Sequence, residues 1–245
     1  MSSLSQHLPH LANLTWATLA DKPILETGAT VFAFLAAVRL SRVFCNHPLL
    51  NPTLLAILFI AIGIEATGVR YETYLRGSDP VHFMLGPAVV LLAVPLFRQT
   101  ATIRASGRLI AIGLLVGLPV GVLSAVGIAW LLGASPQTIL SLAPKSVTAG
   151  IAVGVSEQIG GLQNLTIVLV IMTGITGAVL GPIVTRLARV HDPRVVGLSI
   201  GIASHGIGTA RALHINEVAG AFASLGMGLN GVLTAVLLPL LLRLF

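Results

Sequence analysis

The chain has 245 residues, of which 55% are hydrophobic and only 9% are charged, and its mean hydropathy is +0.96. A soluble domain carries about a quarter charged residues, so this composition excludes the soluble class and predicts one all-α, polytopic membrane domain. The net charge of +6 comes mostly from arginines at the ends of apolar runs, as the positive-inside rule predicts, so nucleic-acid binding is not implied. The single cysteine, Cys45, excludes an internal disulfide.

The first part of the chain is predicted to form a scaffold. Residues 1–23, of which 4–19 are mildly amphipathic, are expected to lie at the membrane interface. The transmembrane domain then covers 24–245, with scaffold spans in 24–108 and a site-bearing part in 109–245. The scaffold spans expected are 24–44, 53–67 and a shorter one at 83–97, which Gly86-Pro87 and Pro95 should kink or interrupt. The stretch 68–80 is expected to be an outer interfacial loop.

The site-bearing part is predicted to contain an inverted repeat. Its elements are a span at 109–132, an interrupted segment at 139–158, a span at 165–187, an interrupted segment at 195–213 and a last span at 218–242. If 139–158 crossed the membrane, the arginines after 165–187 would lie outside, whereas a re-entrant or unwound segment places them inside. The positive-inside rule favours the second arrangement. Inverted repeats whose discontinuous helices meet at mid-membrane are typical of secondary transporters.

Glycines recur at short spacings in these segments. They are Gly113, Gly117 and Gly121 in one span, Gly174, Gly177 and Gly181 in another, and Gly197 with Gly201 in the second interrupted segment. Such small residues allow helices to approach closely. We interpret them as packing surfaces and not as ligands.

The first interrupted segment places charge in an apolar setting. Pro144 and four glycines loosen the stretch 143–161, which contains Lys145 and Glu157. A charge at the centre of a span costs roughly 2.5 to 3.5 kcal/mol on insertion scales, so it is expected to face water, a partner or a ligand. The alternatives are that Lys145 is an interfacial anchor that snorkels outward and that Glu157 lies at the outer surface or pairs with a cation.

The second interrupted segment has similar chemistry, with small residues, a threonine and Arg211. Gly206 and Gly208 allow positive φ and would expose backbone N–H groups. A half-helix beginning near Thr209 would then point its positive end at the site. Lys145 and Arg211 would together neutralise an anion, Arg211 by a bidentate contact. Alternatively, Arg211 belongs to the cytoplasmic positive cluster.

A substrate site follows from these two segments. The predicted substrate-binding residues are Lys145, Ser146, Thr148, His205, Thr209 and Arg211. Glu157 or His205 would carry a coupled proton, and Gln158 and Asn230 would make secondary polar contacts. The alternatives are that the hydroxyls satisfy their own helix backbone, that His205 packs internally and that Asn230 cross-links helices. No cofactor, metal ligand or catalytic residue is predicted, since the sequence lacks HExxH and a nucleophile–base pair.

Three long motifs resemble the LrgB/CidB family of bacterial membrane proteins: Ser141 to Thr148 (SLAPKSVT), Ser156 to Gly161 (SEQIGG) and Ala203 to Leu213 (ASHGIGTARAL). Shorter matches are Leu50 to Pro52, Leu85 to Ala88 and Gly220 to Leu229. The resemblance covers nearly the whole chain from about residue 24. Ala149-Gly150 departs from the Thr-Pro-like pair expected there, which affects the local shape of the first interruption.

The resemblance implies two functions. One is transport of small monocarboxylates, of the glycolate, glycerate, lactate or pyruvate type, because the family is similar to the plastid glycolate/glycerate translocator. The other is holin-like or antiholin-like modulation of murein hydrolase export and autolysis, with a small LrgA/CidA-like membrane protein as partner. The residues favour a secondary transporter of the bacterial inner membrane, in which the paired charged interruptions have a use. A homodimer is a further expectation for its assembly.

Overall fold

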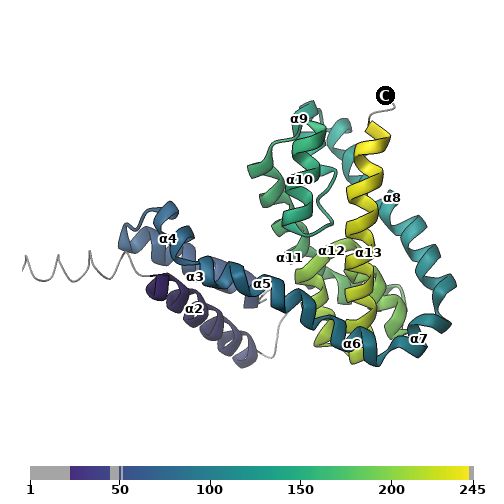
Figure 1. Ribbon diagram of the computed structural model, residues 1–245, viewed down its shortest axis with the longest axis horizontal. Helices are drawn as coiled ribbons and strands as arrows, with labels where there is room; N and C mark the ends of the chain where they lie inside the picture. The colour runs from purple at the N-terminus through teal and green to yellow at the C-terminus, as the bar shows by residue number, and fades with distance from the viewer. Residues whose placement is uncertain (1–22, 45–49, 51, 243–245) are drawn as a thin grey trace, which may run out of the picture. The chain divides into compact units, whose positions relative to one another are not determined.

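A computed structural model describes residues 23–44, 50 and 52–242 (Figure 1). The expected interfacial segment 1–23 lies outside the described residues except for its last position. The described part is helical throughout and divides after Leu91 into two compact units, which are considered separately. The first unit contains α2 (Pro23–Val43), α3 (Pro52–Thr67), α4 (Tyr71–Gly77) and α5 (Asp79–Leu91). The second contains α6 (Ala93–Arg98), α7 (Thr100–Ala105), α8 (Gly107–Leu131), α9 (Pro136–Leu142), α10 (Ala149–Ile159), α11 (Gln163–Leu187), α12 (Pro193–Leu213) and α13 (Glu217–Leu242).

Several of these helices are long and apolar enough to cross a bilayer. In the described ranges, four stretches of 20 to 26 residues have a mean hydropathy of 1.9 to 2.5: Asp79–Arg98, Gly107–Leu131, Gln163–Leu187 and Glu217–Leu242. The chain is therefore a polytopic helical membrane protein. The third scaffold segment was expected to be kinked or interrupted at Gly86-Pro87 or Pro95. Pro87 lies inside α5, and Leu92, between α5 and α6, keeps helical φ/ψ of −65°/−15°.

The first unit has a small core and one helix that was expected to be a loop. Ala37 of α2 packs with Leu55 and Ala56 of α3. The stretch 68–80 contains α4, so its assignment as a loop is wrong. Tertiary contacts to α2 account for the helix: the Thr27 hydroxyl donates to a carbonyl of α4, and the hydroxyls of Thr30 and Tyr74 lie 2.8 Å apart.

The arginine-rich ends of the second unit lie together. Arg194, at the start of α12, donates from Nη1 to the Ser106 hydroxyl at the start of α8 over 3.2 Å. Arg98 of α6 lies 3.7 Å from Glu217 at the start of α13. The same end carries the Asp192 cap of α12, and the side-chain hydrogen bonds from Arg194 hold the pKa of this carboxyl below its usual value. Helices α8, α12 and α13 therefore all begin at one end of this unit.

Helices α12 and α13 pack side by side in the same direction. Gly197 lies against the carbonyl of Ala219, and Gly201 lies against the carbonyl of Ala223. The contacts advance by four residues on both helices, so the two axes are parallel and close, as small residues permit. Phe222 of α13 completes an apolar core with side chains of α8 and α12, namely Ile110, Leu114, Leu198 and Ile202.

The glycines of α8 form the groove that their spacing predicts. A Cβ at Gly113 would lie 2.6 Å from Leu198, and one at Gly117 would lie 3.3 Å from Ile202. Gly121, one turn further along, faces the hydroxyl of Ser146. The groove therefore receives two side chains of α12 and ends at the first interruption.

Candidate binding cavity

The first interruption is a turn between α9 and α10. The backbone leaves the helix after Leu142 and resumes at Ala149, with Thr148 as an extended N-cap residue whose side chain makes no capping bond. The chain then comes back toward α9, since the amide nitrogen of Leu162 donates to the Ser141 hydroxyl over 2.7 Å. Residues 136–162 thus form a hairpin, which we call the first hairpin.

Buried hydroxyls hold the ends of the first hairpin together. Thr166 of α11 is fully buried, and its Oγ1 lies 2.7 Å from the Ser156 hydroxyl and 3.1 Å from the Ser141 carbonyl. Gly161 has no room for a side chain, because a Cβ there would lie 2.9 Å from the Ser141 nitrogen. The position of the turn at 143–148 therefore depends on this network.

Thr166→Val is expected to lower the free energy of unfolding by about 1 to 3 kcal/mol, because valine keeps the shape and leaves buried polar groups without a donor. The measurement is thermal unfolding in detergent. Thr176→Val, at an exposed position of the same helix, is the matched control and should change little. Equal effects of the two substitutions would show that the hydroxyl network contributes nothing to the free energy of unfolding.

The second interruption folds α12 back on itself. Ser204 and His205 leave helical geometry, with φ/ψ of −135°/16° and 40°/−138°. A Cβ at Gly208 would lie 2.5 Å from the Ser204 Cβ and 3.1 Å from the Ile200 carbonyl oxygen. Ala212 clusters with Val196, Ile200 and Ala223. Residues 193–213 thus form a second hairpin, with an outgoing limb at 193–203 and a returning limb at 206–213.

Positive φ occurs at His205, whereas Gly206 and Gly208, which would allow it, do not adopt it. Instead, the missing Cβ of Gly208 lets the returning limb approach the outgoing one. A non-glycine residue with this φ is held by its surroundings. The ring of His205 packs against Gly174, and its Nε2 lies 2.9 Å from the Val170 carbonyl of α11.

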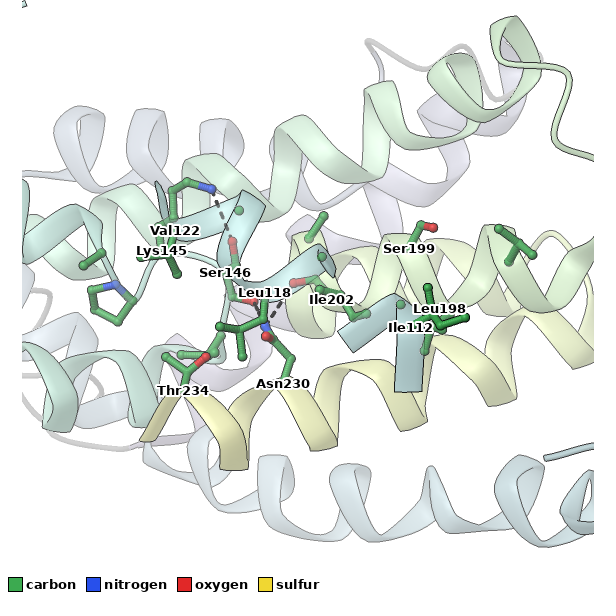
Figure 2. Close-up of a pocket in the computed structure, with 18 of the residues that line it drawn as sticks. Ile112, Leu118, Val122, Lys145, Ser146, Leu198, Ser199, Ile202, Asn230 and Thr234 are labelled. Atoms are coloured by element: carbon green, nitrogen blue, oxygen red, sulfur yellow. Dashed lines mark hydrogen bonds between the residues drawn. The ribbon is translucent and has the colours of Figure 1, made fainter. Parts of the chain in front are cut away.

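Asn230 of α13 joins the two hairpins at their turns. Its Nδ2 donates to the Ser146 carbonyl over 3.4 Å and to the Ile202 carbonyl over 3.0 Å. Figure 2 shows its amide between the two carbonyl groups. The side chain is 2% exposed. These contacts correspond to the alternative in which Asn230 cross-links helices, and its partners are the backbones of both interruptions. The expected secondary polar contact with a substrate stays a prediction.

A cavity of about 440 Å³ opens beside this junction. Its walls come from α8, the turn 143–147, the outgoing limb of α12 and α13 (Figure 2). The volume lies within the range of small-molecule sites. Its polar side chains are Lys145, Ser146, Ser199, Asn230 and Thr234, and the remaining walls are apolar or glycine.

Lys145 is the one ionisable side chain among the described residues that line the cavity. Its Nζ lies 3.2 Å from the Ser146 hydroxyl, so an ammonium with three donors has one partner there. No described carboxylate pairs with it. A single positive charge in mostly apolar walls is suited to a small anion with one negative charge.

The other predicted site residues lie elsewhere. Thr148 follows the turn and does not line the cavity. Thr209 is buried on the returning limb and donates to the His205 carbonyl, and His205 faces α11. Glu157 and Gln158 are exposed near the end of α10.

The structure does not bring Arg211 and Lys145 into one site. Arg211 lies in the last turn of α12 and does not line the cavity. The reason is the returning limb, along which six residues of helix after His205 carry Arg211 about 9 Å back toward the arginine-rich end. The half-helix N-terminus expected at Thr209 does not line the cavity either. The part of α12 that does is the outgoing limb, whose C-terminal end reaches the cavity. A shared Lys145–Arg211 anion site is therefore not formed in this structure.

Two polar residues of the lining, Ser199 and Thr234, were not predicted. Thr234 lies four residues after Asn230 and Ser199 lies four before Ala203, so each shares a helix face with another residue of the lining. That spacing could have identified Thr234. Ser199 had no comparable signal, because isolated serines in apolar helices usually bond to their own backbone.

The model of the LrgB-like family matches residues 30–244, which include both hairpins and the cavity. The chain belongs to the LrgB-like family. It is 36% identical over 200 residues to the holin-like protein CidB of Staphylococcus epidermidis, covering 82% of this chain and 87% of that protein. The holin-like protein CidB of Staphylococcus aureus strain Mu50 is 35% identical over 216 residues, covering 88% and 94%.

Relatives of this LrgB-like protein extend beyond the staphylococci. An uncharacterized protein of Haemophilus influenzae is 30% identical over 220 residues, covering 90% of this chain and 95% of that protein. No solved structure matches the chain at a significant level. The resemblance of the three motifs to this family is confirmed, and the family is one of membrane proteins, not of enzymes.

Proposed function

We propose that this LrgB-like protein is a secondary transporter of small monocarboxylates in the bacterial inner membrane. The observation that supports it best is the cavity at the meeting point of two hairpins, with Lys145 as its one ionisable side chain among the described residues. The substrate carboxylate would take the free donors of the Lys145 ammonium. The hydroxyls of Ser146 and Thr234 would hydrogen-bond to the remainder of the substrate.

The arrangement of the hairpins supports alternating access. The second hairpin begins at the end where α8 and α13 begin, whereas the first is connected to the opposite end of α8. In a bilayer these would be two re-entrant hairpins of opposite orientation, related as inverted repeats. With the arginine-rich end in the cytoplasm, the glycine groove of α8 would let the hairpins shift against α8.

A coupled proton would give the transport its driving force. His205 lies in the turn of the second hairpin, and its ring contacts α11. A proton gained or lost by this ring would change that contact and with it the position of the hairpin. Glu157 is the second candidate, at an exposed position near the end of α10. The two assignments differ in the variant that uncouples uptake from a pH gradient, His205→Gln or Glu157→Gln.

Uptake into proteoliposomes tests the proposal. The purified chain should give saturable uptake of labelled lactate, glycolate or pyruvate that exceeds uptake by empty liposomes, after its orientation has been established. Uptake should be inhibited by an excess of unlabelled acid. Absence of saturable uptake of all three acids would contradict the proposal.

A holin-like function is the second candidate, favoured by the name of the staphylococcal relatives, holin-like protein CidB. In this case the chain would modulate murein hydrolase export, with a small LrgA/CidA-like membrane protein or a second copy as partner. It predicts that a large polar dye leaks from liposomes that contain the protein and that Lys145→Ala leaves autolysis unchanged. The carrier retains the dye, and its transport depends on Lys145.

A further inference from the structure

The cavity is elongated, with its charge at one end. Its α8 wall runs from Leu109 to Val122, a stretch of helix that rises about 20 Å. The hydroxyl of Ser146 lies beside Gly121, near the end of this wall, and Lys145 contacts that hydroxyl. Figure 2 shows Lys145 at one end of the lining residues and Ile112 at the other.

The end away from Lys145 has apolar walls, which come from α8 and from the outgoing limb of α12. We call this part the apolar arm, and its residues are Leu109, Ile112, Gly113, Val195, Leu198 and Ser199. Ser199 is the one polar side chain of the arm among the described residues. A bound water needs two to four polar partners, so the arm is better suited to an alkyl chain than to water.

The volume of the cavity also exceeds what a three-carbon acid fills. At the liquid volume of water, about 30 Å³ for each non-hydrogen atom, the six such atoms of lactate take about 180 Å³. The cavity has about 440 Å³, which by the same measure holds about 15 atoms. With the carboxylate of such an acid at Lys145, the apolar arm would remain unfilled.

We propose that the apolar arm binds the alkyl chain of a ligand whose carboxylate lies at Lys145. The cavity then binds straight-chain monocarboxylates of about eight to twelve carbons more tightly than acids of two to four carbons. The inference rests on the proposed transport function and deepens it, because it assigns a longer class of acid to the same site. The charge of Lys145 holds one end of the ligand, and burial of methylene groups in the arm holds the other.

A series of acids of increasing length tests the arm. Labelled octanoate is bound to the full chain in nanodiscs and is displaced by unlabelled butyrate, hexanoate, octanoate, dodecanoate or tetradecanoate, each at free concentrations below micelle formation. The concentration for half displacement should fall about fourfold for each added CH₂ up to octanoate. It should level off between dodecanoate and tetradecanoate, where the arm is full. Empty nanodiscs measure the octanoate that dissolves in lipid.

Three variants locate the two ends of the ligand. Ser199→Leu narrows the arm, since Ser199 is exposed and lines it. It should reduce the advantage of octanoate over butyrate from about 200-fold to a few-fold and leave butyrate unchanged. Ala210→Leu is the matched control, because it adds the same side chain at an exposed position of the returning limb outside the lining. Lys145→Gln should weaken all the acids by a similar factor.

Three results would overturn the inference. They are displacement by octanoate that is no better than by butyrate, a gain that continues unchanged to tetradecanoate as for dissolution in lipid, and a full chain-length series in Ser199→Leu. The wild-type series decides even if Ser199→Leu does not fold. Each of these results leaves transport intact, because binding is measured without uptake. Absence of uptake of any acid into proteoliposomes would instead overturn the proposed function.

Discussion

Lys145→Gln is expected to reduce kcat/KM for monocarboxylate uptake by about 100-fold. The substitution keeps a polar side chain of similar length and removes the one charge that lines the cavity in the described part of the chain. A charge-assisted hydrogen bond is worth about 1.5 to 3 kcal/mol net, and each 1.36 kcal/mol corresponds to a factor of ten in rate. The measurement is initial uptake into proteoliposomes over a range of substrate concentrations.

Two arginine variants make this result specific. Arg104→Gln removes a charge from exposed α7, outside the cavity lining, and should leave uptake within a few-fold of wild type. Arg211→Gln distinguishes the site seen in the structure, which contains only Lys145, from the site expected from the sequence, which contains both cations. A shared Lys145–Arg211 anion site predicts that both substitutions are equally damaging. The returning limb of α12 predicts that only Lys145→Gln is severe.

Gly201→Ala is expected to destabilise the protein by about 3 kcal/mol. A Cβ at this position would overlap the carbonyl oxygen of Ala223, which belongs to the backbone of α13 and cannot rotate away. The two parallel helices would have to separate, and overpacking of this kind costs about 1 to 3 kcal/mol or more. Separation would also pull the Ile202 carbonyl from Asn230, so uptake should fall together with the unfolding temperature in detergent.

Gly228→Ala provides the comparison on α13. No atom lies within 4 Å of a Cβ built there, and alanine is favoured over glycine in helices by about 1 kcal/mol. The variant should be as stable as wild type or slightly more stable. If Gly201→Ala were equally well tolerated, the close parallel packing of α12 and α13 would be contradicted.

The elements themselves were largely predictable from the sequence. Apolar run lengths indicated the spans, and Pro144 and Gly206 marked the two interruptions. Segment 71–77 was not expected to be helical, because a seven-residue polar stretch has no convincing pattern, and it owes its helix to contacts with α2.

The site was predictable only in part, because a residue's type indicates its chemistry and not where the fold places its side chain. Lys145 stood out as a charge in an apolar segment, and it does line the cavity. Arg211 stood out for the same reason, but the position of the fold-back decides where it lies, and the strained residue there is His205. The link from Asn230 to two carbonyls 84 and 28 residues away could not be derived from local sequence.

Binding of a small anion in the cavity through Lys145 is tested most directly by protection of a cavity cysteine from alkylation. In a Cys45→Ser background, Leu118→Cys places a thiol in the cavity wall, and Gln137→Cys places one at an exposed position of α9. Saturating lactate should slow alkylation at position 118 and not at 137, and adding Lys145→Gln should abolish the protection. An alkylation rate at 118 that is unchanged by lactate, glycolate and pyruvate would contradict the claim.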